Sequence, residues 1–287
     1  MKIAFDSKLR LGEANKTRLQ TINAILEEYR ADGYVLTLRQ LYYQLVARGV
    51  IENAISEYRR LSVILKKGRI AGIVDWSSIE DRVRKPKIPY YVADVEDAIR
   101  DTVEQYRLDR MKGQDHKLEI WVEKDALSNV LSRVTSKYHL RLMVNRGYSS
   151  ATAMYEASRR LDNGDTILYF GDHDPSGLDM LRDIKERLEE FHTFVDVVPV
   201  ALTMAQIKKF NPPPNPAKVS DPRATWYIDN FGDTSWELDA LPPQELIRLA
   251  EMHVERRVDM DLWQRQVDLE KSDIVEMKKK FGLDEKE

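Results

Sequence analysis

The sequence predicts an α/β protein in two parts: a helical unit of the helix-turn-helix type, then a larger domain with a mainly parallel sheet flanked by helices. Two observations favour this fold class. Three short helical stretches come first, and from residue 118 onward strand-like and helix-like runs alternate. Such alternation is typical of parallel sheets covered by helices. We place the first domain at residues 1–112 and the second at 113–287, with the boundary beside Gly113.

In the first part, apolar residues recur at helical spacing over residues 14–30. Thr37 is expected to cap a second helix that ends at Gly49, and a third helix is expected from Ser56 to about Lys67. The segment 69–87 is expected to form a short hairpin or wing, and 94–110 a connecting helix. Three helices followed by a hairpin are the helix-turn-helix pattern.

In the second part, four short apolar runs predict the strands of the sheet. They cover residues 118–122, 140–144, 167–170 and 194–200, and helices are expected at 125–137, 150–161, 175–191 and 203–209. The proline-rich segment 211–222 predicts an exposed loop without regular structure. Residues 242–281 are expected to be largely helical, as a dimer strut or as a solvated helix.

Composition excludes several classes of protein. The chain of 287 residues has no Cys, which excludes disulfides, thiolate metal sites and cysteine nucleophiles. No apolar run approaches membrane-spanning length, and the start MKIAFDSKLR does not resemble a signal peptide. We therefore expect a cytoplasmic protein that does not bind membranes.

A net charge of −3 means that any contact with nucleic acid must come from a local basic patch. Between Arg59 and Lys87 there are nine basic residues and only three acidic ones. Phosphate is the natural partner of such a segment, although a solvated helix face is the alternative. The candidate DNA-binding residues here are Arg59, Arg60, Lys66, Lys67 and Arg69.

The segment TILYFGDHDPSGLDML, residues 166–181, joins a strand to a helix through Asp172 and Asp174. Residues two apart at the end of a strand project to the same side, and Glu123 ends an earlier strand of the same predicted sheet. Three carboxylates at one edge predict a site for Mg²⁺ or Mn²⁺. The alternative is a loop that only caps the next helix, for which Pro175 and Ser176 are suitable residues.

Two basic residues accompany this site. Lys124 follows Glu123 and could neutralise a phosphate oxygen, or it is an ordinary surface lysine. Arg146 ends the second strand beside Gly147, where close approach of the backbone to a phosphate is possible, or where the chain simply turns. His173 is expected to face away from the metal side, and Glu237 is interpreted as structural.

The carboxylate pattern resembles the Toprim domain of topoisomerases, primases and related nucleases. In more detail, IWVEKDALSNVL, NRGYSSATAMYEA and ILYFGDHDPSGLDML resemble the A subunit of topoisomerase VI and the related meiotic double-strand-break transesterase. The resemblance covers about residues 14–240. It implies a winged-helix domain followed by a Toprim domain, and a homodimer that cuts both strands of duplex DNA.

The stretch TLRQLYYQL resembles the family motif in which an arginine precedes the catalytic tyrosine by four positions. The resemblance therefore implies that Tyr43 is the nucleophile and Arg39 its phosphate-binding neighbour, whereas Tyr42 is the better core candidate. In the family, the tyrosine of one subunit works with the acidic residues of the other. A phenol has a pKa of about 10, so it needs a positive field such as that of Arg39 to attack phosphorus.

The chain departs from the family in four ways. It is shorter than a typical A subunit, it has His173 between the two aspartates, it carries Ser149-Ser150 where the family usually has Pro-Asp, and it has no phosphate-cradling loop of an ATPase. ATP-driven strand passage would therefore need a separate ATPase (B-type) subunit. Two other functions stay open: a Toprim nuclease that hydrolyses DNA with metal-activated water, and a DNA- or partner-binding module without activity.

Overall fold

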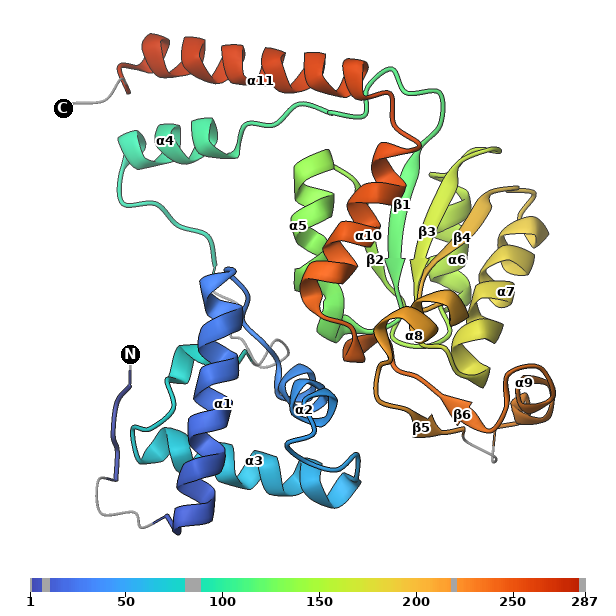
Figure 1. Ribbon diagram of the computed structural model, residues 1–287. Coiled ribbons are helices and arrows are strands. Elements are labelled where there is room, and N and C mark those ends of the chain that lie inside the picture. The colour runs from blue at the N-terminus through green and yellow to red at the C-terminus, as the bar shows by residue number, and fades with distance from the viewer. Residues whose placement is uncertain (1, 7–10, 81–88, 218–220, 284–287) are drawn as a thin grey trace.

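A parallel sheet lies at the centre of the C-terminal part (Figure 1). The computed structural model describes residues 2–6, 11–80, 89–217 and 221–283. Within these residues the main sheet has four strands in the order β2-β1-β3-β4, and every neighbouring pair is parallel. The strands are β1 (Leu118–Val122), β2 (Arg141–Val144), β3 (Thr166–Phe170) and β4 (Asp196–Ala201), which confirms the predicted parallel sheet.

Helices cover both faces of this sheet (Figure 1). Side chains alternate along β1, so that Ile120 and Val122 enter one core and Trp121 enters the other. Helices α5 (Ser128–Tyr138) and α10 (Pro243–Glu255) pack on the first face, and α6 (Ala151–Ser158) and α7 (Pro175–Glu190) on the second. The central strands β1 and β3 are buried and mostly apolar, with Glu119 as an exception within β1, and their positions follow from the sequence.

After β4, the chain forms α8 (Met204–Phe210), α9 (Ala224–Phe231) and a small hairpin. The prediction of an exposed, irregular loop over 211–222 is wrong in part. Asn215–Pro216 forms β5, which pairs with β6 (Thr234–Ser235), and Pro212, Pro213 and Ala217 are buried. Proline is compatible with this two-stranded edge because only alternate residues donate to the partner strand. Residues 218–220 lie outside the described ranges.

The N-terminal unit contains α1 (Glu13–Ala31), α2 (Leu38–Ala47) and α3 (Ile55–Ile70) around one apolar core. Thr37 caps α2 as predicted: Gln40 N donates to Thr37 Oγ1, and Thr37 N donates back to Gln40 Oε1 at 2.8 Å. After α3 comes a single 3-10 turn, Trp76–Ser78, and Leu36 forms an isolated bridge with Ile79. The predicted wing over 69–87 falls partly on residues 81–88, outside the described ranges, so the winged helix stays a prediction.

Two helices form an arm beside the body of the molecule (Figure 1). The predicted helix over 94–110 is shorter, since α4 ends at Gln105 (Val95–Gln105), and it packs along α11 (Met260–Phe281). Tyr106 leaves the helical conformation, and its hydroxyl donates to Asp273 at 2.7 Å. Glu270 accepts from Leu108 N at 2.9 Å and from Arg110 at 2.6 Å. These contacts with α11 take the place of a further helical turn.

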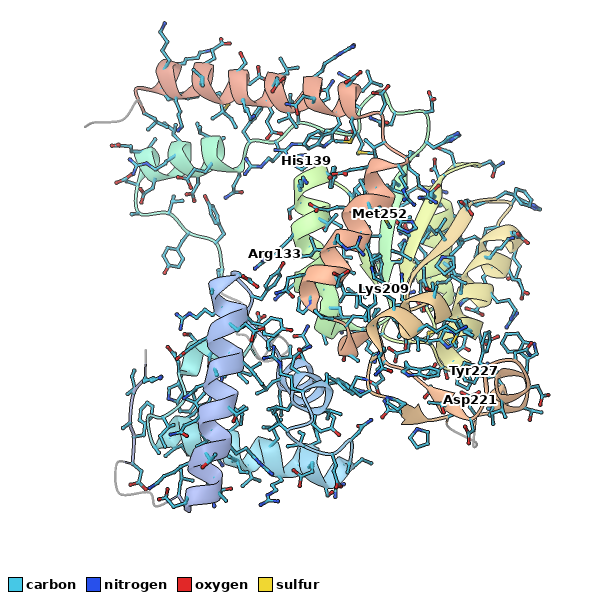
Figure 2. The ribbon with its side chains drawn as sticks, in the orientation of Figure 1. Arg133, His139, Lys209, Asp221, Tyr227 and Met252 are labelled. Carbon is cyan, nitrogen blue, oxygen red and sulfur yellow. The ribbon has the colours of Figure 1, made fainter. Side chains whose placement is uncertain are left out.

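Besides hydrogen bonds of Asn53 with Asn215 and of Gln244 with Asp32, the N-terminal unit contacts the sheet domain through Arg133 and through helix α2. Arg133 of α5 projects toward this unit in Figure 2, donates to the carbonyl of Gly33 and lies over the ring of Tyr34 at 4.3 Å. Helix α2 contacts the 3-10 turn Leu238–Ala240, and Ala240 enters the N-terminal core. The contact through α2 carries the candidate site. In the described parts of the chain, no helix combines the length and the apolar character needed to span a bilayer.

Candidate acidic site at the carboxyl end of the sheet

Glu123 and Asp172 lie side by side at the carboxyl end of the sheet. Each follows one of two neighbouring parallel strands, β1 and β3, whose ends meet at the same edge. Glu123 N donates to the carbonyl of Phe170 at 2.8 Å, and Asp172 N donates to Glu123 Oε2 at 2.9 Å. Two of the three predicted carboxylates are therefore adjacent.

Asp172 is buried, with 7% of its surface exposed. Its Oδ1 accepts from Leu238 N at 2.8 Å, and its Oδ2 lies 2.6 Å from Lys124 Nζ. Burial raises the pKa of the Asp172 carboxyl, Lys124 opposes this rise, and Glu123, Glu237 and Asp239 add to it. The pKa of Glu123 is raised in the same direction, mainly by burial. Lys124 offsets the charge of these two carboxylates only in part, because the pKa of each stays raised.

Asp174 has a structural task, as the alternative interpretation proposed. It is the N-cap of α7, and Gly177 N donates to its Oδ1 at 2.7 Å. The expectation that Ser176 caps this helix is wrong, because its hydroxyl donates to Asp221 at 2.7 Å instead. A side chain at Gly177 would meet the Asp172 carbonyl at 2.2 Å, so only glycine lets α7 begin so close to Asp172.

His173 faces away from the other two residues of this motif. Its ring nitrogen Nδ1 lies 2.8 Å from the hydroxyl of Tyr227, which is labelled in Figure 2 beside α9. The same hydroxyl donates to the His173 carbonyl at 2.8 Å. His173 therefore fixes α9 against the strand end and contributes no ligand to the acidic side.

Glu237 and Asp239 belong to the site, although the sequence interpretation treated Glu237 as structural and did not consider Asp239. Glu237 Oε2 accepts from Lys124 Nζ at 2.9 Å and from Arg39. Asp239 Oδ2 lies 3.3 Å from Arg39 Nε and 4.0 Å from Lys124 Nζ. The only signal in the sequence was their i, i+2 spacing before a proline pair, which is common in surface turns. We call Glu123, Asp172, Asp174, Glu237 and Asp239 the acidic cluster.

Helix α2 carries Arg39 and Tyr43 to the acidic cluster. Tyr43 is buried, with 4% of its surface exposed, and packs edge-on against Tyr42 with ring centroids 5.2 Å apart. Burial raises the pKa of the Tyr43 hydroxyl to about 12, and Glu237 adds to the rise, while Arg39 and a hydrogen bond with Asn215 oppose it. Both tyrosines thus belong to the core, and Tyr43 alone of the two has its hydroxyl beside Arg39.

The acidic cluster suits a hard cation in the kind of its ligands, but its side chains have other partners. All five donors are carboxylates, which Mg²⁺ prefers, and the neighbouring cations are Lys124 and Arg39. Among the residues that the structure describes, no three histidine or acidic side chains are grouped so that they could hold a metal ion. The predicted triad of Glu123, Asp172 and Asp174 therefore stays a prediction.

The predicted DNA-binding residues lie on two surfaces. Arg59, Arg60, Lys66 and Lys67 are exposed on α3, while Arg69 is half-buried, donates to the carbonyl of Ile79 at 2.9 Å and lies over the Trp76 ring. A pocket of about 490 Å³ between α2, α3 and the sheet domain is lined by Arg39, Lys66 and Arg69 among others.

On the sheet domain, Lys124 is enclosed by carboxylates, and Arg146 is exposed and pairs with Asp125 at 3.2 Å. The other basic residues of the predicted patch, Arg82, Arg84, Lys85 and Lys87, lie outside the described ranges.

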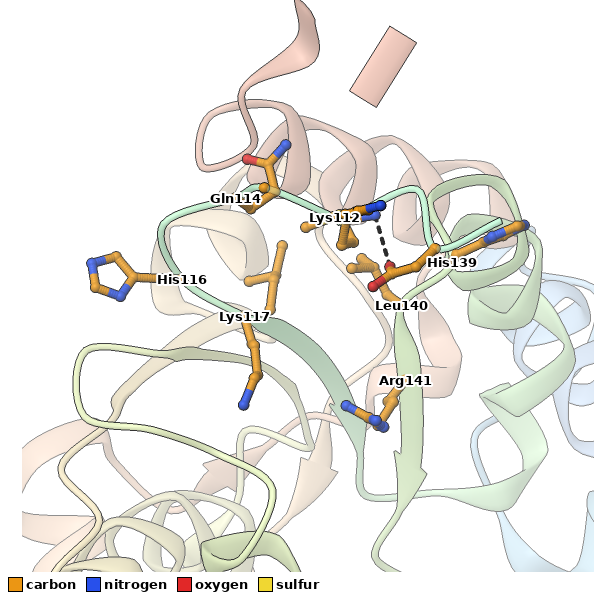
Figure 3. A pocket seen from close by; sticks show the side chains of 11 residues that line it. Lys112, Gln114, His116, Lys117, His139, Leu140 and Arg141 are labelled. Atoms are coloured by element: carbon orange, nitrogen blue, oxygen red, sulfur yellow. Dashed lines mark hydrogen bonds between the residues drawn. The ribbon is translucent and has the colours of Figure 1, made fainter. Parts of the chain in front are cut away.

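A second pocket, of about 540 Å³, lies at the opposite end of the sheet (Figure 3). It is lined by Lys112, His116, Lys117 and Arg141, with Asp109. Two of these cations already have partners, because Lys117 Nζ lies 2.6 Å from Asp162 Oδ2 and Arg141 lies 3.9 Å from Glu119. The lining of this pocket holds more basic than acidic side chains, whereas the site at the carboxyl end is rich in carboxylates.

We compared the chain with protein-family models, with curated proteins and with solved structures, and none of the three comparisons gives a match. The resemblance to the topoisomerase VI A subunit and to Toprim domains therefore stays a prediction that rests on the residues quoted above.

Proposed function

We propose that this protein is a divalent-metal-dependent transesterase that cleaves duplex DNA, similar to the A subunit of topoisomerase VI. The observation that supports the proposal most is the position of Glu237. One of its oxygens accepts both from Arg39 of α2 and from Lys124, which pairs with Asp172. Through this carboxylate, the helix that carries Tyr43 is joined to the acidic cluster.

In the proposed reaction, Tyr43 Oη attacks the phosphorus of a phosphodiester and forms a 5′-phosphotyrosyl bond as the bond to the 3′ oxygen breaks. The phenolic proton passes to Glu237. Burial raises the pKa of this carboxyl, but Lys124, Arg39 and a hydrogen bond with Tyr43 lower it overall. The departing 3′ oxygen takes a proton from solvent, and Arg39 offsets the charge on the phosphate. One phosphodiester is exchanged for another, so the DNA strand can be resealed.

Mg²⁺ or Mn²⁺ held by Glu123, Asp172 and Asp174 would supply further positive charge at the phosphate. A homodimer that cuts both strands is part of the proposal, and ATP-driven strand passage would require a separate B-type subunit. The family pairs the tyrosine of one subunit with the acidic residues of the other. Here Tyr43 lies near Glu237 of its own chain, so the separation of α2 from the acidic cluster is the step that would allow exchange between subunits.

The experiment is covalent trapping. The protein is incubated with supercoiled plasmid and Mg²⁺ and then denatured. The proposal expects protein attached to the 5′ ends of the cut DNA, and complete loss of this adduct in Tyr43→Phe. Tyr42→Phe is the matched control: it is equally buried, but its hydroxyl bonds Asn53 at 2.9 Å, so this variant should still form the adduct.

One observation favours a second function, hydrolysis by metal-activated water. A buried phenol with a pKa of about 12 provides little phenolate at neutral pH. Under this alternative, trapping yields free 5′ phosphates, and Tyr43→Phe cuts as well as the wild type. If no Mg²⁺-dependent cutting occurs with either protein, both enzymatic proposals fail and a binding module is favoured.

A further inference from the structure

Lys124 occupies the centre of the acidic cluster. Its ammonium lies 2.6 Å from Asp172 Oδ2, 2.9 Å from Glu237 Oε2 and 4.0 Å from Asp239 Oδ2. These carboxylates come from segments more than 60 residues apart in the chain, and they meet at this one amine. A surface lysine would leave its ammonium in water, whereas the side chain here is only 16% exposed.

Lys124 and the expected metal ion would bind the same side chain, Asp172. Asp172 is the central member of the predicted metal triad, and its Oδ1 is already taken by the backbone N–H of Leu238. Its other oxygen, Oδ2, faces the ammonium of Lys124. A divalent ion and this ammonium would therefore compete for the same carboxylate oxygen.

We propose that Lys124 is an internal competitor of the divalent cation, whose ammonium neutralises Asp172 until a metal ion displaces it. The inference rests on the proposed metal site. No bond is made or broken in this exchange, and the amine keeps its proton. The displaced ammonium keeps Glu237 and Asp239 as neighbours, because both already lie within 4.0 Å of it.

The exchange has a consequence for Arg39. The same Glu237 oxygen accepts from Lys124 and from Arg39, and both cations also approach Asp239 Oδ2. When Lys124 leaves Asp172, it competes with Arg39 for these two carboxylates. Metal binding would thereby loosen the contact between α2 and the acidic cluster and leave the Arg39 guanidinium available to a phosphate.

The test is Mn²⁺ binding, measured by calorimetry without DNA. Removing the charge in Lys124→Gln should tighten Mn²⁺ binding by about tenfold or more, because a like charge a few ångströms away is lost. Lys117→Gln is the matched control. It breaks an ion pair of the same length, 2.6 Å to Asp162, at the other end of the sheet, and its affinity should equal that of the wild type.

The possible outcomes separate the inference from the proposed function. If wild type and Lys124→Gln bind Mn²⁺ equally, or the variant binds more weakly, Lys124 is not a competitor, while the metal site itself stands. If neither binds Mn²⁺, the metal site fails together with the inference. Should Lys124→Gln not fold, Lys124→Arg keeps the charge and should bind no more tightly than the wild type; tighter binding by this variant overturns the inference.

Discussion

Glu119 lies near the start of β1 and Glu123 directly follows its end, and the two carboxylates have different neighbours. Glu119 is 1% exposed and accepts from Arg160 Nε at 2.8 Å, from Arg160 NH2 at 3.0 Å and from Trp121 Nε1 at 2.9 Å. Glu123 accepts from Asp172 N; burial raises its pKa, Asp174 and Asp239 add to the rise, and Lys124 opposes it. Glu119 thus has an arginine and an indole N–H as its own partners, whereas Glu123 lies among other carboxylates with Lys124 as the cation that offsets them in part.

This difference separates a structural carboxylate from a candidate functional one. A buried carboxylate with a bidentate arginine and an indole N–H contributes to stability as long as every partner is present. A buried carboxylate beside other carboxylates costs free energy on folding, which is expected where a cation or a phosphate-bearing substrate binds. The excess of anions at the carboxyl end is therefore a better indication of function than the acidic residues themselves.

The largest change in the free energy of unfolding is expected for Glu119, near the start of β1. Glu119→Ala leaves the Arg160 guanidinium and the Trp121 N–H without their acceptor, and it should lower the free energy of unfolding by about 3 kcal/mol. Urea denaturation followed by circular dichroism measures this loss.

Glu123→Ala is the variant to compare with Glu119→Ala, because Glu123 directly follows the other end of β1. It removes one hydrogen bond from Asp172 N but also removes repulsion within the acidic cluster, so the free energy of unfolding should change by less than about 1 kcal/mol. Equal losses in the two variants would mean that both glutamates are structural, and the comparison would no longer mark the carboxyl end as a functional site.

A change in stability between those of Glu119→Ala and Glu123→Ala is expected from the pH dependence of Tyr43. Its pKa is raised to about 12 in the folded protein, so the neutral phenol stabilises the fold below the unfolded pKa, and this contribution disappears as the pH rises toward 12. Relative to Tyr43→Phe, the wild type should lose about 1.4 kcal/mol of unfolding free energy between about pH 8 and about pH 11. Denaturant titrations of both proteins at the two pH values measure the difference, and parallel curves would show that the phenol is not enclosed.

The smallest change in the free energy of unfolding is expected for Lys117, which lines the pocket at the amino end of the sheet (Figure 3). Lys117 and Asp162 form an ion pair of 2.6 Å, but both side chains are largely exposed. Lys117→Gln should therefore change the free energy of unfolding by about 0.5 kcal/mol or less, and added salt should reduce even this difference. A loss comparable with that of Glu119→Ala would indicate that this pocket is a tightly organised site as well.

Much of the fold could be predicted from local patterns. The bounds of β1 agree to the residue, because four of its five residues are apolar and the whole strand is buried. The helix after Asp94 was predicted five residues too long, because its end depends on contacts of Tyr106 and Leu108 with α11. Helix α9 was missed because no apolar periodicity separates it from the proline-rich segment before it.

By itself, the sequence determined the parallel sheet, the cap at Thr37 and the meeting of Glu123 with Asp172 at one edge, because strand period, capping and parallel connection are local rules. Only the tertiary structure decided that Lys124 and Arg39 share Glu237 and that Tyr43 is enclosed. Those contacts join segments that lie far apart in the chain. They depend on packing and on the balance of buried charge, which no short stretch of sequence encodes.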